Sequence, residues 1–258
     1  MLNRSSIVRA IDFREPWFVD RTAELGEELK LHRKLWEFVV IAQVYRERIQ
    51  YIQGLGKALG FGVGLEPLAS WFAAQEAEVL ATDYPFMRKE WKGQQAAGLL
   101  DMWKPSVCNG TRFDEKVRFC KVDMRTIPAD LLRGEFDFVW SCGSLEHLGG
   151  LNQGLDFICQ SMQCLRHGGW AVHTTEFNPR PGATLESPDL SLYQYFHLDQ
   201  LRTRLKQQDD SLLELDVLPG TEEVDRIIDS PPYGIPHLKL IVADRWITTS
   251  IVLIVRKG

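Results

Sequence analysis

The sequence predicts an α/β fold: a seven-stranded, mostly parallel sheet with an antiparallel last strand, helices on both faces, and an N-terminal helical cap. From residue 57 onward, short apolar segments of strand character alternate with amphipathic segments of helical periodicity, as in parallel strands joined by helices. The last apolar segment, 246–255, follows the preceding strand without a helical crossover, which indicates antiparallel pairing. Residues 1–50 fall outside the alternation. We therefore divide the chain into a cap segment, 1–50, and a main domain, 51–258.

The apolar pattern also places the individual elements. One long or two shorter helices are expected between residues 20 and 48, either covering a ligand site or packing on the sheet for stability alone. The strands are predicted at 57–61, 78–82, 117–123, 136–142, 170–177, 212–218 and 246–255. Helices are predicted at 68–73, 90–103, 128–132, 151–165 and 197–205, and loops at 178–196 and 220–244.

Composition excludes several classes of partner. The chain has 258 residues, 45% hydrophobic and 25% charged, with a net charge of −5 and no run rich in lysine or arginine. A phosphate backbone requires such a basic surface, so nucleic acid is not expected as a partner. The longest apolar runs are too short to span a bilayer, and nothing near the first residues resembles a signal peptide. Five cysteines without a C-x-x-C pair suggest reduced thiols in a cytoplasmic protein.

The first predicted strand ends in a glycine turn. Gly60, Gly62 and Gly64 stand at alternate positions, and glycine allows backbone conformations and close ligand approach that other residues prevent. Pro67 suits the first turn of the helix that follows. Asp83 closes the next strand, about 20 residues beyond the glycines, where an acid suits the hydroxyl pair of a ribose. The arrangement predicts a nucleoside site.

Glu66 indicates which nucleoside the turn accepts. The dinucleotide fingerprint G-x-G-x-x-G places a pyrophosphate at the helix N-terminus, but here the third glycine comes early and Leu65 takes its place. Glu66 would also put a negative charge where the pyrophosphate must lie. S-adenosylmethionine carries an ammonium and a sulfonium and no phosphate, so the acid favours this cofactor. Asp83 is compatible with either ligand.

The order and spacing of several motifs resemble the Rossmann-like, class I S-adenosylmethionine-dependent methyltransferases, from about Lys57 to the end of the chain. The resemblance is closest to the small-molecule branch, in which the fourth strand continues into Leu-Glu-His. The motifs that carry it are the Gly60–Gly64 turn, Asp83, 122–124, 136–148 and 165–169. The family usually has an acid two residues before the first glycine, where this chain has Ala58, and Glu66 is a nearby acid that partly compensates.

The resemblance implies a role for each matching position in an S-adenosylmethionine-binding domain over 51–258. The three glycines would line the methionine part of the cofactor, and Asp83 would bond the ribose, the alternative being a helix cap. Asp123 would accept from the adenine amino group, with Met124 against the base. Ser141 and Cys142, at the end of the fourth strand, would meet the amino-acid part and the incoming acceptor. All lie at the edge where open α/β sheets bind ligands.

The catalytic residues follow less directly. A hydroxyl nucleophile must lose a proton, and His147 is the leading candidate base because imidazole ordinarily exchanges protons near neutrality. A histidine that only packs at the start of a helix is the alternative. Glu146 and Glu176 are the next carboxylates on the same rim.

A metal is not expected at this strand end. Some relatives place a Glu-x-x-Glu-His cluster here, but Gly143 replaces the first acid. His173 is a weak candidate for a third ligand, because a strand histidine is more often a satisfied core residue, and a catalytic site normally needs three protein ligands.

Residues 230–233 spell Ser-Pro-Pro-Tyr, which resembles a motif of DNA amino-methyltransferases. That motif must follow the fourth strand, and here it lies far downstream, so we interpret it as a turn; Tyr233 and His237 on the same loop would reach an acceptor. The sequence as a whole predicts methyl transfer to a small-molecule or sugar-like acceptor, at a hydroxyl oxygen. An N-methyltransferase acting on protein or nucleic acid, a non-catalytic cofactor-binding subunit and a nicotinamide oxidoreductase remain the alternatives.

Overall fold

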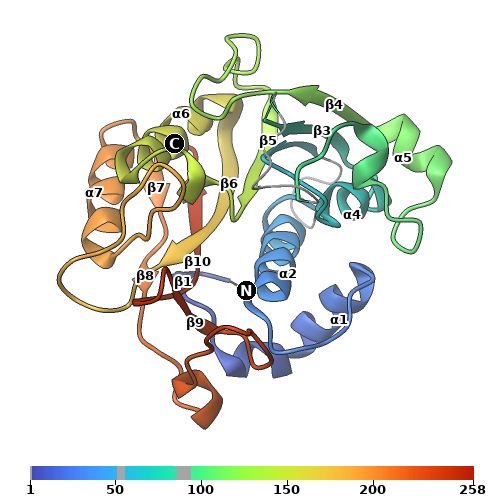
Figure 1. Ribbon diagram of the computed structural model, residues 1–258. Coiled ribbons are helices and arrows are strands. Elements are labelled where there is room, and N and C mark those ends of the chain that lie inside the picture. Colours follow the sequence, from blue (N-terminus) through green and yellow to red (C-terminus); the bar gives the residue numbers. More distant parts are fainter. Residues whose placement is uncertain (1, 51–55, 85, 87–93) are drawn as a thin grey trace.

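The computed structural model describes residues 2–50, 56–84, 86 and 94–258. Within them the main sheet has eight strands, in the order β4-β3-β2-β5-β6-β10-β7, with β9 paired to β10 (Figure 1). Strands β2 to β6 are parallel and β10 is antiparallel to β6, as predicted. Their bounds are β2 Lys57–Phe61, β3 Glu78–Asp83, β4 Val117–Lys121, β5 Phe136–Cys142, β6 Leu165–Phe177, β7 Ser211–Leu212, β9 Lys239–Val242 and β10 Trp246–Arg256.

The sixth predicted strand, 212–218, is wrong as a single element. Only β7 joins the main sheet, whereas β8, Leu215–Asp216, pairs in parallel with β1, Ser5–Ser6, in a separate two-stranded sheet. The N-terminal strand displaces it: the Ser5 amide bonds Glu214, and the Ser5 hydroxyl accepts from the Ile254 amide of β10. Strand β9 was not predicted, because 220–244 was assigned to a loop.

Six α-helices in the described residues surround the sheet: α1 Pro16–Glu24, α2 Arg33–Tyr45, α4 Leu68–Ala74, α5 Gly110–Lys116, α6 Leu151–Ser161 and α7 Tyr195–Lys206. The two N-terminal helices confirm the reading of 20–48, and α2 continues into a π-helical turn, Arg46–Gln50. Figure 1 shows α6 and α7 on one side of the sheet and α2 and α4 on the other. Helices thus cover both faces, as predicted.

Two helical predictions need correction, and one helix was missed. Of the predicted helix 90–103, residues 90–93 lie outside the described residues, and 94–103 hold only a short 3-10 helix, Leu99–Met102. Asp101 accepts from the Ala97 and Gly98 amides there and so stabilises a tight turn instead of an α-helix. Residues 128–132 form tight turns, because their amides bond carbonyls three residues back. Helix α5 was not predicted.

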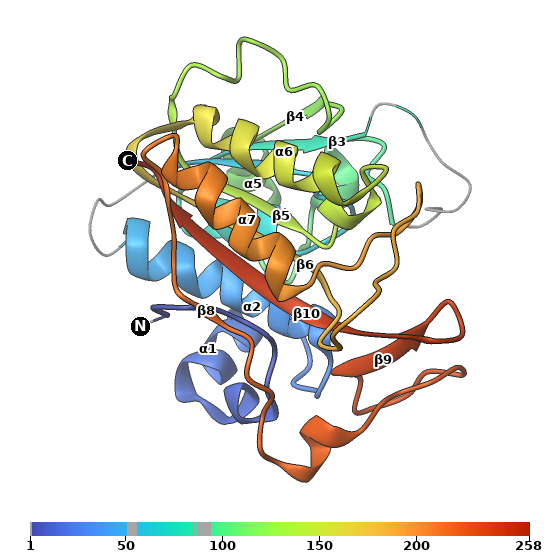
Figure 2. The same ribbon diagram turned by 90° about the vertical axis from the view of Figure 1, so that its left-hand side faces the viewer.

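The N-terminal segment shares its hydrophobic core with the sheet. Phe138 and Trp140 of β5 face a cluster that includes Val39 and Ile41 of α2, whereas Val139 faces the cluster on the α6 side. This alternation follows from the two-residue period of a strand. Figure 2 shows α2 running beneath the sheet, so that its first turn lies near β9. In the described residues, every helix is too short or too polar to cross a membrane.

Candidate ligand-binding cavity

Backbone geometry accounts for two of the three glycines in the turn after β2. Gly62 and Gly64 have φ of 60° and 50°, the left-handed region that favours glycine. Gly60 has another role: a β-carbon there would lie 2.3 Å from the Trp140 ring. Gly60 therefore makes room for a core tryptophan, and it does not line the cavity described next.

A cavity of about 560 Å³ opens at the carboxyl ends of β2, β3 and β5. Its size is within the usual range for small-molecule sites. One wall, here called the strand-end wall, comprises 62–66, Asp83, 122–124, Cys142 and Ser144. The facing N-terminal wall comprises 32–34, Phe38 and His237. Eight of the twelve predicted site residues line the cavity: Gly62, Gly64, Glu66, Asp83, Asp123, Met124, Cys142 and His147.

Asp83 organises the nucleoside end of the strand-end wall. Its carboxylate accepts three backbone N–H groups, from Gly64 (3.2 Å), Tyr84 (2.7 Å) and Ala96 (2.7 Å). Burial raises its pKa, and the three amides act in the opposite direction. The acid therefore connects the glycine turn to the loop after β3, and it does so without capping a helix. A carboxylate has about four acceptor sites, so it can still accept from a ligand hydroxyl.

Asp123 is bound by a neighbour in this structure. Both its oxygens accept from the Arg125 guanidinium, at 2.6 to 3.1 Å, and Arg125 also donates to the Tyr84 hydroxyl (3.1 Å). Met124 lines the cavity beside it. Recognition of an adenine amino group by Asp123 would have to share the carboxylate with Arg125, and it stays a prediction.

Glu66 places a carboxyl group in the wall just beyond the glycine turn. Its Oε1 accepts from the Trp140 indole N–H at 2.7 Å. Burial raises the pKa of Glu66 to about 8, although this hydrogen bond favours the carboxylate. In the free protein near neutral pH the group is thus mostly protonated. A cation placed against it would draw it into the charged form.

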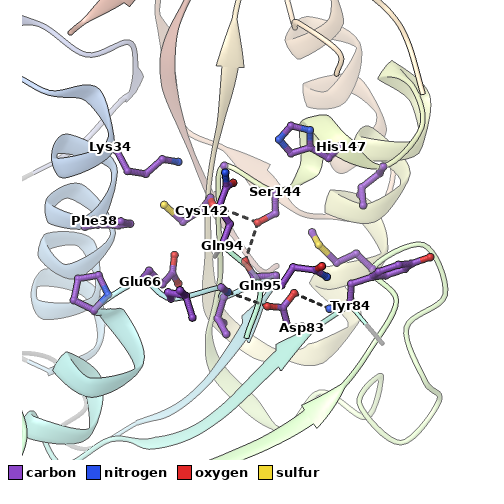
Figure 3. Close-up of a pocket in the computed structure, with 18 of the residues that line it drawn as sticks. Lys34, Phe38, Glu66, Asp83, Tyr84, Gln94, Gln95, Cys142, Ser144 and His147 are labelled. Atoms are coloured by element: carbon purple, nitrogen blue, oxygen red, sulfur yellow. Dashed lines mark hydrogen bonds between the residues drawn. The ribbon is translucent and has the colours of Figure 1, made fainter. Parts of the chain in front are cut away.

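The N-terminal wall holds a lysine that the sequence analysis missed. Lys34 Nζ donates to Glu37 Oε2 at 2.7 Å, and Figure 3 shows the ammonium facing His147 across the cavity. Burial is the largest single influence on the pKa of Lys34 and lowers it, but the attraction of Glu37 and of other nearby acidic groups together raises the pKa, so the ammonium stays charged. A β-carbon on Gly143, which has φ of 59°, would lie 2.3 Å from Nζ. Glycine at 143 thus gives the ammonium its place.

The same wall is closed by contacts between distant segments. The rings of His32 and His237 stack with centroids 4.7 Å apart. The Arg33 amide donates to the His237 carbonyl (3.0 Å), and the His237 amide donates to the Leu31 carbonyl (2.8 Å). His237 Nδ1 pairs with Asp229. Of the two loop residues predicted to reach an acceptor, His237 lines the cavity, whereas the Tyr233 hydroxyl bonds the Ile241 carbonyl and Tyr233 is not among the lining residues.

His147 lies opposite Lys34 on the short 3-10 helix Leu145–His147 after β5 (Figure 3). Its Nδ1 lies 2.5 Å from the Asp189 carbonyl. Because a carbonyl only accepts, Nδ1 is the donor in this hydrogen bond. The role of His147 as a base stays a prediction.

Ser141, Glu146 and Glu176 are turned into the protein interior, outside the cavity lining. Ser141 bonds His173 Nδ1 (2.8 Å), which is fully buried with a pKa lowered to about 3 by burial and is a satisfied core residue. Glu146 accepts from the Thr175 hydroxyl (3.0 Å), and burial raises its pKa. Glu176 pairs with Arg33 and accepts from Thr248 (2.6 Å). These contacts support the walls.

No protein-family model matches the chain, and no curated protein matches it in sequence. Solved structures match its fold. The [4+2]-cyclase SpnF is 15% identical with a TM-score of 0.55, over 98% of this chain and 99% of that one. The 1,6-didemethyltoxoflavin-N1-methyltransferase of Burkholderia thailandensis is 14% identical with a TM-score of 0.52, over 96% of this chain and 86% of that one. Its structure contains S-adenosylhomocysteine and 1,6-didemethyltoxoflavin.

A methyltransferase-like structure from Bacillus halodurans is 13% identical with a TM-score of 0.51, over 84% of this chain and 98% of that one. At such low identities the likeness establishes the fold. The chain has the class I S-adenosylmethionine-dependent methyltransferase fold that the sequence predicted.

Proposed function

We propose that the protein is an S-adenosylmethionine-dependent methyltransferase that acts on a small-molecule or sugar-like acceptor, at a hydroxyl oxygen. The observation that carries the proposal is the pairing, in one cavity, of a nucleoside-type acid, Asp83, with a buried carboxyl group, Glu66, directly after the glycine turn. A pyrophosphate would find no positive charge at Glu66, whether this group is protonated or ionised. A ligand with a ribose and a positive charge near the turn complements both groups.

The residues present fit this cofactor. Gly62 and Gly64 leave the backbone bare for the methionine part, Asp83 would bond the ribose, and Met124 would pack on the base. When bound, the cofactor supplies an electrophilic methyl group next to a sulfonium. Glu66 and the ends of β2 and β5 would surround its amino-acid part.

For a hydroxyl acceptor, the chain itself must orient the oxygen and accept its proton. His147 lines the cavity and is the base of this proposal (Figure 3). Holding the oxygen near the methyl carbon would supply most of the rest of the rate acceleration, because positioning alone can lower an activation barrier by about 7–11 kcal/mol. Phe38 and Leu148 offer apolar contacts to an acceptor.

The cavity volume of about 560 Å³ supports a small acceptor. The stacked His32 and His237 close one side, and the net charge of −5 gives no attraction for a nucleic acid. The five free cysteines agree with the further proposal that the protein works in the cytoplasm. The fold also occurs in a cyclase, SpnF, so the methylated product itself must be detected.

The test is an acceptor screen with S-adenosylmethionine, read by mass spectrometry as a mass gain of one methyl group together with S-adenosylhomocysteine release. With an acceptor in hand, we expect His147→Ala to lower kcat by about 100-fold, the scale of one general base, and to leave S-adenosylhomocysteine affinity unchanged. His167→Ala, an exposed histidine outside the cavity lining, is the control. Equal turnover in His147→Ala and the parent would remove the base assignment; failure to bind S-adenosylhomocysteine would remove the function.

A further inference from the structure

The Lys34 ammonium is a charged donor that the protein leaves partly unused. An ammonium has three N–H donors, and among the described residues Glu37 is its one hydrogen-bond partner. The side chain is 38% exposed and lines the cavity. At least one donor therefore faces the space that a ligand would fill.

Glu37 is shared with several other groups. Its Oε1 accepts from the Ser250 hydroxyl (2.5 Å), and its Oε2 accepts from the Thr174 hydroxyl (2.9 Å) as well as from Lys34. The Arg33 guanidinium is 4.0 Å away. Arg33 also pairs with Glu176, so each of the two cations has a carboxylate partner of its own.

The position of Lys34 is built into the fold. Glu37 is 1% exposed, and removing charged groups from water in this way is costly. Gly143, in a left-handed conformation at the end of β5, vacates the volume next to Nζ. A long lysine held over a glycine by a buried acid is a fixed cation at the rim of the strand-end wall.

A carboxyl group that takes a negative charge on ionisation, Glu66, lies on the other side of Cys142. The Cys142 thiol contacts Glu37 Oε2 (3.4 Å) and also lies beside Glu66. Figure 3 shows Lys34 and Glu66 above and below Cys142 on the same side of the cavity. An amino-acid zwitterion has this pair of charges, a carboxylate and an ammonium on one carbon.

We propose that Lys34 binds the carboxylate, and Glu66 the ammonium, of the amino-acid end of the cofactor. The inference rests on the proposed function and adds to it a specific role for the N-terminal segment. Lys34 would then supply an anchor from outside the 51–258 domain. The nucleoside end would remain the task of Asp83.

The experiment is a cycle that pairs each protein change with the matching change in ligand. Calorimetry measures the affinities of three ligands: S-adenosylhomocysteine, its analogue without the carboxylate, and its analogue without the amino group. Each affinity is measured for the wild type, Lys34→Met, Lys34→Arg and Glu66→Gln. We expect Lys34→Met to weaken the binding of S-adenosylhomocysteine and of the deaminated analogue about tenfold or more. The affinity for the decarboxylated analogue should change less than about twofold. Lys34→Arg should recover much of the loss. Glu66→Gln should weaken the binding of S-adenosylhomocysteine and of the decarboxylated analogue, and should change the affinity for the deaminated analogue little.

The controls separate charge from folding. Lys104→Met removes the same charge from another part of the cavity lining. We expect it to weaken the binding of S-adenosylhomocysteine and of its decarboxylated analogue equally. The double variant Lys34→Met/Glu37→Gln removes both charges of the pair, so no unpaired buried carboxylate is left. It replaces the single variant in the binding measurements if Lys34→Met unfolds. Equal losses for S-adenosylhomocysteine and the decarboxylated analogue in Lys34→Met would overturn the inference. So would a Lys34→Met protein that binds S-adenosylhomocysteine normally and loses only an acidic acceptor. Absence of S-adenosylhomocysteine binding to wild type would instead reject the proposed function.

Discussion

The two walls of the cavity are held together in different ways. The strand-end wall is organised mainly by contacts near the ends of adjacent strands, such as Asp83 with the amides of Gly64 and Ala96. The N-terminal wall depends on contacts between segments that are far apart in sequence, such as Glu37 with Ser250, 213 residues away. The first wall follows from the order of the strands, whereas the second requires the whole chain to be folded.

The difference assigns stability and recognition to different residues. Behind the N-terminal wall, Glu37 and Arg33 are buried in ion pairs, so their loss should be felt throughout the fold, whereas Lys34 of the same wall also faces the cavity. Polar groups in the strand-end wall face the cavity, so their loss should be felt first by a ligand. The predictions below test this division, beginning with the largest effect.

Glu37→Ala is expected to have the largest effect on folding. It leaves Lys34 without its carboxylate and removes the acceptor of two buried hydroxyls, and breaking a buried pair in this way costs about 3–5 kcal/mol. Urea denaturation followed by circular dichroism measures the change in the free energy of unfolding.

Asp199→Ala is the matched control, because it breaks an ion pair with Arg202 in which both side chains are about half exposed. A surface pair of this kind contributes about 0–1 kcal/mol. If Glu37→Ala and Asp199→Ala destabilise the protein equally, the N-terminal wall is not the stabilising element described here.

Asp83→Ala is expected to act on ligand binding. The variant loses the ribose acceptor and the hydrogen bonds that hold the glycine turn. Its affinity for S-adenosylhomocysteine, measured by calorimetry, should fall at least tenfold, or about 1.4 kcal/mol. Glu78→Ala removes an exposed carboxylate at the other end of the same strand and should leave the affinity unchanged. Unchanged affinity in Asp83→Ala would withdraw the ribose assignment.

The sequence predicts the strand-end wall because its signals are local. Gly62 and Gly64 are in the left-handed conformations that the turn required, and Asp83 lies at the end of its strand and in the cavity. Gly60 shows the limit of this reasoning, since a glycine that accommodates Trp140 looks the same in sequence as one that faces a ligand. The parallel pairing of β2 to β6 also followed from the alternation of strands and helices, whereas the pairing of β8 with β1 did not.

The N-terminal wall could not be predicted to the same depth. Apolar periodicity placed α2, but it gave no sign that Lys34 would meet Gly143 or that His32 would stack on His237. These contacts depend on how three distant segments pack. One signal was available: Glu37 interrupts an apolar run in α2, and a charged residue in such a run is rarely buried without a partner.

The smallest predicted effect is on the pH dependence of ligand affinity. It tests whether Glu66 contacts the ligand or only stabilises the fold. Its pKa of about 8 lies above the ordinary 4.5, so the free protein holds the proton at pH 7, and the raised pKa contributes stability that is lost as pH rises toward 8. A positively charged ligand prefers the ionised form, so binding should release most of one proton at pH 7. Relative to Glu66→Gln, in which only the ligand titrates, affinity for S-adenosylmethionine should therefore rise about fivefold between pH 7 and pH 8.

Calorimetry in buffers of different ionisation enthalpy measures the released proton directly. Glu66→Gln has no group to ionise, so the buffer dependence should disappear and only the titration of the ligand itself should remain. Because Gln can still accept from the Trp140 N–H, the comparison isolates the charge from the hydrogen bond. Proton release that is equal in Glu66→Gln and in the parent would place the titrating group elsewhere, and Glu66 would then be part of the packing around Trp140.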